Sequence, residues 1–231
     1  MMALIKKELR IYIASPIFSV TAGLFLFMTG YAFTIYMTQA SPRQLPEASI
    51  RGMIYFMSIL LLFMTPFLTM RSFSEEKKTG TIELLKTSPL SDFQILAAKY
   101  LSVLSLFVIL LVLTFEFPVF IFLTGKPDMG PMILSYLGLF LLGASLAAIG
   151  LFMSLLTKSQ MLAAILTFIF ALFLWFLADT AGEWGSRLSL IHHLDSFSLG
   201  VVDTADLFYF ILVIFVFLFL SLRVMESERW K

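Results

Sequence analysis

The sequence contains no cysteine, only two histidines, and few charged residues, at 13% of the chain. The lack of cysteine excludes a disulfide framework, an iron–sulfur cluster and thiolate chemistry. Lysine plus arginine (16) nearly balance aspartate plus glutamate (15), so the charge does not indicate a nucleic-acid-binding protein. Apolar residues are abundant instead: 60% of the residues are hydrophobic, 26 are phenylalanine, and the mean hydropathy is +0.96. A water-soluble domain of this size cannot bury that much apolar surface in one core, so we expect the bilayer to solvate much of it.

Long apolar segments occur six times along the chain, at about residues 17–37, 52–70, 100–124, 132–156, 161–179 and 207–223. Each segment is long enough to cross a hydrocarbon core of about 30 Å at about 1.5 Å per residue. Spanning segments of this kind are helices, because lipid offers no hydrogen-bond partner to the backbone. We therefore predict an all-α membrane protein with six transmembrane helices in one domain, residues 1–231. The first segment has the length of a full span and no clear cleavage site follows it, so we expect it to remain in the mature protein.

Lysines and arginines are distributed unequally between the predicted loops. With the N-terminus placed in the cytoplasm, the cytoplasmic segments hold 12 of the 16 and the outer segments hold 4. Cytoplasmic loops of membrane proteins are enriched in these residues. The bias predicts that both termini are cytoplasmic, in a multi-pass protein of the bacterial cytoplasmic (inner) membrane.

Helix-start signals support these boundaries. Ser15-Pro16 is typical of an N-cap followed by proline in the first turn. Ser91 and Gln94 have the spacing of a capping box and predict the start of the helix that becomes the third span. Asp203 and Asp206 predict a similar start before the sixth span.

The first residues predict a short amphipathic helix lying on the inner leaflet. Over residues 2–13, helical spacing places apolar side chains on one face and cations elsewhere. The apolar face is expected to contain Ile5, Leu9, Tyr12 and Ile13, and the cations are Lys6, Lys7 and Arg10.

The largest predicted cytoplasmic feature is the charged connection between spans two and three, residues 71–99. Gly80 can end a helix that continues from span two, Thr81 can cap a new short helix over 82–86, and Pro89 can end that helix. The result is a short transverse helix that projects from the membrane and can enter a groove on a soluble partner. The alternative interpretation is a solvated, positively charged loop with no partner, because charge runs usually form solvated faces.

The stretch MRSFSEEKKTGTIELLKTSPLSDFQILAAKYLS, residues 70–102, resembles the signature region of ABC-2 type permeases. It is most similar to the six-span permeases associated with bacterial gliding motility and with copper or sodium handling. MALIKKEL near the N-terminus, GLFMSLLTKSQ at 150–160 and SLRVMESERW near the C-terminus resemble the same family at matching places. The resemblance implies that the connection is a coupling helix that docks into an ATPase subunit. On this interpretation the coupling residues are Arg71, Glu75, Glu76, Gly80, Thr81, Glu83 and Lys86, and Thr157-Lys158-Ser159-Gln160 forms a second, smaller contact.

A phosphate-binding loop of the form G-x-x-x-x-G-K-[ST] does not occur in the sequence. We therefore expect no enzyme activity and no cofactor in this chain, with ATP and magnesium bound by a partner ATPase. Six spans make half of a transport pathway, so a second copy or a paralogous permease is also expected. Membrane lipid and, in some systems, a periplasmic auxiliary subunit complete the expected partners.

Two further features have competing interpretations. His192-His193 could suggest a metal or haem, but adjacent helical residues point about 100° apart and no third ligand is evident. They are better explained as part of an amphipathic stretch over 187–199 at the outer interface, with Leu190, Ile191, Leu194 and Phe197 opposite Arg187, His193, Asp195 and Ser196. In ABC-2 permeases the connection before the last span often carries short re-entrant helices, and this stretch is similar.

Glu116 is the one acid well inside a predicted span. Intramembrane carboxylates are costly and often functional. Pro118 follows closely, so Glu116 can instead satisfy freed backbone groups or reach the interface. Both interpretations remain open from the sequence.

The function that this sequence favours is the permease subunit of an ATP-driven ABC transporter, with export as the expected direction. The alternative is an ATP-independent secondary carrier or channel, which would predict inverted repeats, broken helices and midplane charges. The sequence does not indicate the substrate.

Overall fold

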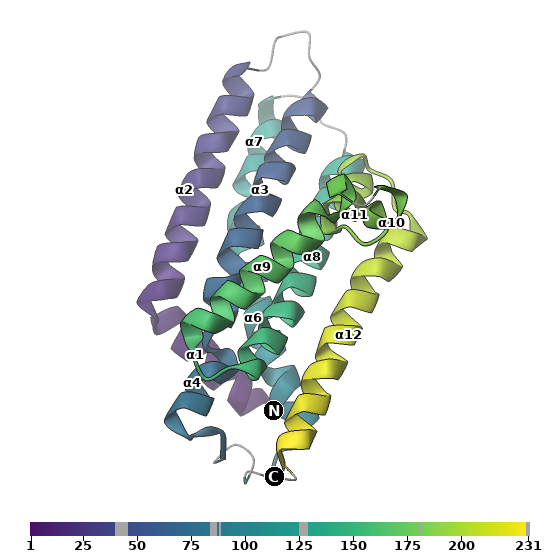
Figure 1. The fold of residues 1–231 in the computed structure, drawn as a ribbon. Coiled ribbons are helices and arrows are strands. Elements are labelled where there is room, and N and C mark those ends of the chain that lie inside the picture. Colours follow the sequence, from purple (N-terminus) through teal and green to yellow (C-terminus); the bar gives the residue numbers. More distant parts are fainter. Residues whose placement is uncertain (40–45, 84–86, 88, 125–128, 181, 230–231) are drawn as a thin grey trace.

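The computed structural model describes residues 1–39, 46–83, 87, 89–124, 129–180 and 182–229, and its regular elements are all helices (Figure 1). Six of them are long and apolar enough to cross a membrane, which confirms the predicted spans. The helices before and within the first three spans are α1 (Met2–Ala14), α2 (Pro16–Gln39), α3 (Pro46–Thr69), α4 (Arg71–Thr79), α6 (Asp92–Leu113) and α7 (Glu116–Thr124). The remaining helices are α8 (Met129–Leu156), α9 (Gln160–Thr180), α10 (Gly182–Ser186), α11 (Leu190–Ser198) and α12 (Thr204–Arg229).

Helix α8 occupies the centre of the bundle and packs against α3, α6, α9, α11 and α12. Small residues on α8 permit the closest of these approaches. A Cβ atom added to Gly150 would lie 2.2 Å from Thr69 Oγ1, and one added to Gly138 would lie 2.8 Å from the Phe197 side chain. These two glycines of α8 therefore serve helix packing, as small residues commonly do in membrane bundles.

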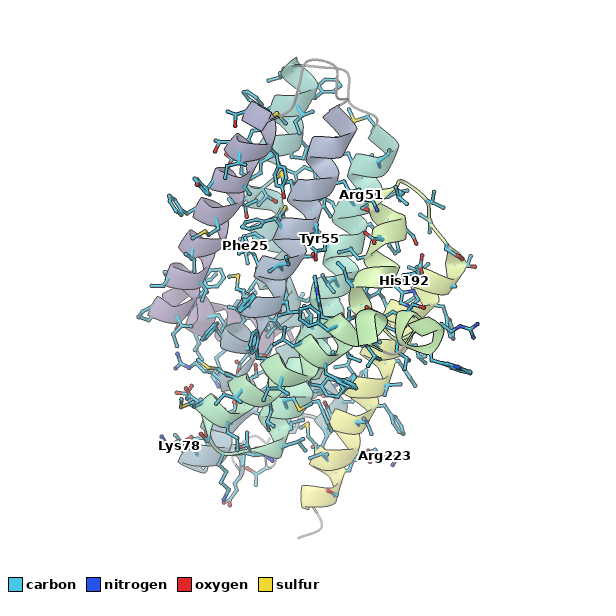
Figure 2. The ribbon with its side chains drawn as sticks, turned by 45° about the horizontal axis from the view of Figure 1, so that its top comes forward. Phe25, Arg51, Tyr55, Lys78, His192 and Arg223 are labelled. Atoms are coloured by element: carbon cyan, nitrogen blue, oxygen red, sulfur yellow. The ribbon has the colours of Figure 1, made fainter. Side chains whose placement is uncertain are left out.

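The ends of the bundle differ in character. Helix α1, helix α4 and the C-terminal end of α12 lie together at one end, which we call the charged end (Figure 1). Helices α10 and α11 lie away from it, beside the opposite ends of α9 and α12 (Figure 1). In Figure 2, Lys78 and Arg223 lie toward the charged end, whereas Arg51 and His192 lie away from it.

Two of the three predicted helix starts are confirmed in detail. Pro16 is the first residue of α2. Ser91 and Gln94 form the expected capping box: Ser91 Oγ accepts from Gln94 N, and Gln94 Oε1 accepts from Ser91 N. At α12 only half of the prediction is right. Asp203 accepts a hydrogen bond from Ala205 N, but the Asp206 carboxylate turns to His193 instead.

Helix α1 has a buried stripe that the sequence analysis did not predict. The buried residues of α1 are Leu4, Glu8 and Tyr12, whereas Ile13 is exposed. These buried positions are spaced four residues apart, so they form one stripe on the helix. The sequence argument overlooked this stripe because its middle residue is an acid, and an acid is buried only where a cation on another element pairs with it.

Candidate functional site

Helix α4 extends span two beyond the apolar region and carries the charges of the candidate site. Its N-terminal residues Ser72, Phe73 and Ser74 are buried, and its basic residues Lys77 and Lys78 lie in the last turn, where they complement the helix dipole. The helix ends at Gly80, whose φ of 75° is in the left-handed region that favours glycine. The predicted helix stop at Gly80 is therefore confirmed.

Lys99 joins three helices through a buried ammonium group. Its side chain is 2% exposed, and its Nζ lies 2.6 Å from the Ser72 carbonyl oxygen, 2.8 Å from Glu76 Oε1 and 3.4 Å from Glu8 Oε1. An ammonium group has three N–H donors, and these three acceptors match them. The Nζ atom also lies 5.0 Å from the centroid of the Phe73 ring. Helices α1, α4 and α6 are therefore held together by one cation and two carboxylates.

Arg71 fastens the start of α4 to the turn between α1 and α2. Its guanidinium forms a bidentate salt bridge with Glu75: Nε lies 2.8 Å from Oε2, and Nη2 lies 3.2 Å from Oε1. Its Nη1 donates to Ser15 Oγ at 3.0 Å. The planar guanidinium suits this geometry, which a lysine could not reproduce.

Tyr12 adds a buried hydrogen bond between α1 and α4. Its hydroxyl lies 2.7 Å from Ser72 Oγ. Burial raises the pKa of the Tyr12 phenol well above its ordinary value, so the hydroxyl remains protonated and can take either role in this bond.

Ser154 links the start of α4 to the central helix α8. Its Oγ accepts from the backbone N–H groups of Phe73 and Ser74, each at 3.1 Å, and donates to the Met70 carbonyl oxygen at 3.1 Å. Near the other end of α4, Lys77 Nζ donates to the Leu155 carbonyl oxygen. A serine near the end of α8 thus fixes the joint between α3 and α4.

A hollow of about 440 Å³ opens at the charged end between α1 and α4. Charged side chains of both signs line it, and they include most of the network described above. The charged lining residues are Lys7, Glu8, Arg71, Glu75, Glu76 and Lys99, and Thr79 and Thr81 lie at the end of α4. Ile11 and Tyr12 add apolar surface from α1 to this lining.

The structure places the predicted coupling residues in two groups. Arg71, Glu75 and Glu76 belong to the network at the base of α4. Gly80, Thr81 and Glu83 are exposed beyond it. Thr81 Oγ1 lies 2.9 Å from Thr79 Oγ1, and Ile82 and Glu83 are helical. Lys86 and the rest of the predicted short helix lie outside the described residues.

The second predicted contact, residues 157–160, connects α8 to α9 near α4, because α4 packs against both helices. Thr157 Oγ1 accepts from Ser159 N, and Ser159 Oγ accepts from Leu162 N in the first turn of α9. The two predicted contact segments therefore lie at the same end of the molecule.

Sequence reasoning missed several residues of this network, among them Glu8, Tyr12, Lys99 and Ser154. Lys99 was counted only as a cytoplasmic charge and Tyr12 only as an apolar contact. The one available signal was the spacing of Leu4, Glu8 and Tyr12, which puts an acid in the middle of the buried stripe of α1. Nothing in the sequence pairs Glu8 with Lys99, because these residues are 91 positions apart.

The other candidate residues lie elsewhere. Glu116 is exposed in the first turn of α7, just after the turn at Thr114 and Phe115 that ends α6. His193, expected on the polar side of its stretch, is buried instead. Its Nδ1 lies 2.6 Å from Asp206 Oδ1, its Nε2 lies 3.0 Å from the Arg187 carbonyl oxygen, and its ring stacks on Tyr209 with centroids 4.0 Å apart. Among the described residues, no group of three metal-ligating side chains comes together.

Comparison with known proteins agrees with this geometry. The sequence matches the family model described as ABC-2 family transporter protein over residues 2–196. No curated protein matches the chain. The matched region contains α1, α4, the Lys99 network and five of the six spans. With most of its length matched, this chain belongs to the ABC-2 transporter family and is a multi-pass membrane protein of the permease type.

Proposed function

We propose that this chain is the permease subunit of an ATP-driven exporter in the bacterial inner membrane, with a separate ATPase subunit docked on the charged end. ABC-2 permeases associate with ABC ATPase subunits, which supports a partner of this kind. The proposed docking element is the end of α4 with Gly80, Thr81 and Glu83, assisted by residues 157–160. ATP and magnesium bind to the partner, and a second copy or a paralogous permease completes the pathway. A periplasmic auxiliary subunit is a further proposed partner.

The observation that carries this proposal is the set of buried polar contacts around α4. Closure of two ATPase subunits must reach the membrane spans as a mechanical displacement. A flexible loop would absorb that displacement. Helix α4 instead continues from span two and is fastened to span three by Lys99, to α1 by Tyr12, and to span four by Ser154. Densely packed elements transmit strain, so a push on α4 moves several spans together.

The test is co-purification from native membranes with wild-type permease and with two variants, Glu83→Lys and deletion of Thr81–Lys86. Losing one desolvated charge at such an interface costs about 2–5 kcal/mol, whereas losing a rim-exposed charge costs much less. We expect both variants to insert normally but to recover less of an ATP-hydrolysing subunit, with transport reduced in proportion. The matched control is Asp195→Lys, a charge reversal at an exposed acid on α11.

Two results would contradict the proposal. If the deletion variant retained its ATPase and transported normally, residues 81–86 would be only a solvated connector. If the purified chain alone hydrolysed ATP, the assignment of ATP hydrolysis to a separate subunit would be wrong. Transport that continues without any ATPase subunit would favour the secondary carrier or channel.

A further inference from the structure

A second hollow, of about 640 Å³, runs between α6 and α12 and is separate from the charged site. Its lining contains no charged side chain among the described residues. Tyr100 supplies the one side-chain hydroxyl in this lining, and that hydroxyl donates to the Ala144 carbonyl oxygen at 3.2 Å. The floor of the groove, including Leu96, is buried, whereas the rims at Phe93 and Phe215 are 65% and 64% exposed. The groove is therefore apolar, concave and open to the surroundings of the bundle.

The position of the groove along α12 matches one leaflet of a bilayer. Its lining on α12 runs from Ile211 to Leu222. At about 1.5 Å per residue this stretch is about 16 Å long, which is about half of a hydrocarbon core of about 30 Å. On α6 the lining begins at Phe93, directly after the first residue of the helix. The groove thus spans the leaflet next to the charged end.

A cation lies at the end of the groove where a lipid headgroup would be. Arg223 follows Leu222, and its guanidinium carbon lies 5.0 Å from the centroid of the Phe219 ring, which lines the groove. The Arg223 side chain is 64% exposed, and its Nη1 donates to Glu226 Oε2 at 3.1 Å. A guanidinium has five N–H donors in a geometry suited to phosphate, so the contact with Glu226 leaves capacity for a phosphate oxygen.

We propose that this groove binds one phospholipid of the leaflet next to the charged end, with an acyl chain along α6 and α12 and its phosphate on Arg223. The groove faces the hydrocarbon region, where acyl chains are the surrounding solvent. The apolar length and the Arg223 cation at its end together match one acyl chain and one headgroup.

The test is native mass spectrometry of the delipidated full-length chain in detergent, titrated with phosphatidylglycerol or phosphatidylcholine. Ala97 lines the groove and Val216 does not, so Ala97→Trp fills the groove and Val216→Trp on α12 is its matched control. Arg223→Gln removes the phosphate contact from an exposed position, and Arg51→Gln away from the charged end is its control. We expect one tightly bound lipid in the wild type and both controls, none in Ala97→Trp, and about tenfold weaker binding in Arg223→Gln, as for one lost charge-assisted hydrogen bond.

Both lipids carry a phosphate, so Arg223→Gln should weaken binding of each. Binding of phosphatidylglycerol and phosphatidylcholine that is unaffected by Arg223→Gln overturns the proposal. We expect this variant to fold normally, because the Arg223 side chain is exposed. Full lipid occupancy in a folded Ala97→Trp variant overturns it as well. A change from dimer to monomer in Ala97→Trp with unchanged lipid binding would assign the groove to a second copy instead.

Discussion

The Lys99 ammonium lies 2.8 Å from Glu76 Oε1, and this contact ties the first turns of span three to the extension of span two. Glu8 approaches the same ammonium from α1 at 3.4 Å. Removing one partner of a buried ion pair leaves an uncompensated charge, which costs about 3–5 kcal/mol. We expect Lys99→Met to lower the thermal midpoint of the purified protein markedly, because two carboxylates are left together without a cation.

The control for Lys99 is a variant in which the acids are neutralised as well, Glu8→Gln with Glu76→Gln and Lys99→Met. The thermal midpoint of this triple variant should lie above that of Lys99→Met alone, because replacing a whole buried ion network by apolar or neutral residues is often tolerated. A thermal midpoint for Lys99→Met equal to that of the wild type would show that the network does not hold the three helices together.

Gly150 permits the close approach of α8 to α3. A Cβ atom at this position would lie 2.2 Å from Thr69 Oγ1 and 2.7 Å from Thr69 Cβ. Overpacking of this kind costs about 1–3 kcal/mol. We expect Gly150→Ala to lower the thermal midpoint, and the matched control Gly23→Ala in α2 to leave it unchanged, because a Cβ at Gly23 meets nothing within 4 Å. Equal stability of the two variants would mean that the two helices can separate without cost.

His193 and His192 are adjacent but differ in burial. His193 is buried between Asp206 and the Arg187 carbonyl oxygen, whereas His192 is exposed. Replacing His193 leaves the buried Asp206 carboxylate without its imidazole partner, which costs about 1–3 kcal/mol. His193→Ala should therefore loosen α11 from α12 and increase proteolysis of residues 187–203, and His192→Ala should behave as the wild type. Equal cleavage of both variants would contradict this role.

Topology can be tested directly because the chain has no cysteine. Lys78 and Arg223 lie toward one end of the bundle, and Arg51 and His192 lie away from it (Figure 2). We expect single cysteines at Lys78 and Arg223 to resist a membrane-impermeant thiol reagent in intact cells, and one at His192 to react. All three should react once the membrane is permeabilised. Labelling at Lys78 in intact cells would reverse the predicted orientation.

Much of the fold could be predicted from local features of the sequence. Span length follows from the thickness of the bilayer, and the helix stop at Gly80 and the cap at Ser91 depend on backbone chemistry within a few residues. The turn at Thr114 and Phe115 that ends α6 was less accessible. It depends on a neighbouring helix, because the Tyr136 hydroxyl of α8 donates to the Thr114 carbonyl oxygen.

The amino-acid sequence by itself determined that the chain is a six-span helical membrane protein and that residues 71–99 are its distinctive polar feature. Hydrophobicity, helix caps and charge bias act along the chain, so they are visible without coordinates. Only the tertiary structure decided which charges meet, because Glu8, Glu76 and Lys99 belong to three different helices and a buried charge is stable only where its partners converge. The same reason explains why His193 is buried and why the groove beside Arg223 could not be foreseen: both depend on the packing of helices that are distant in sequence.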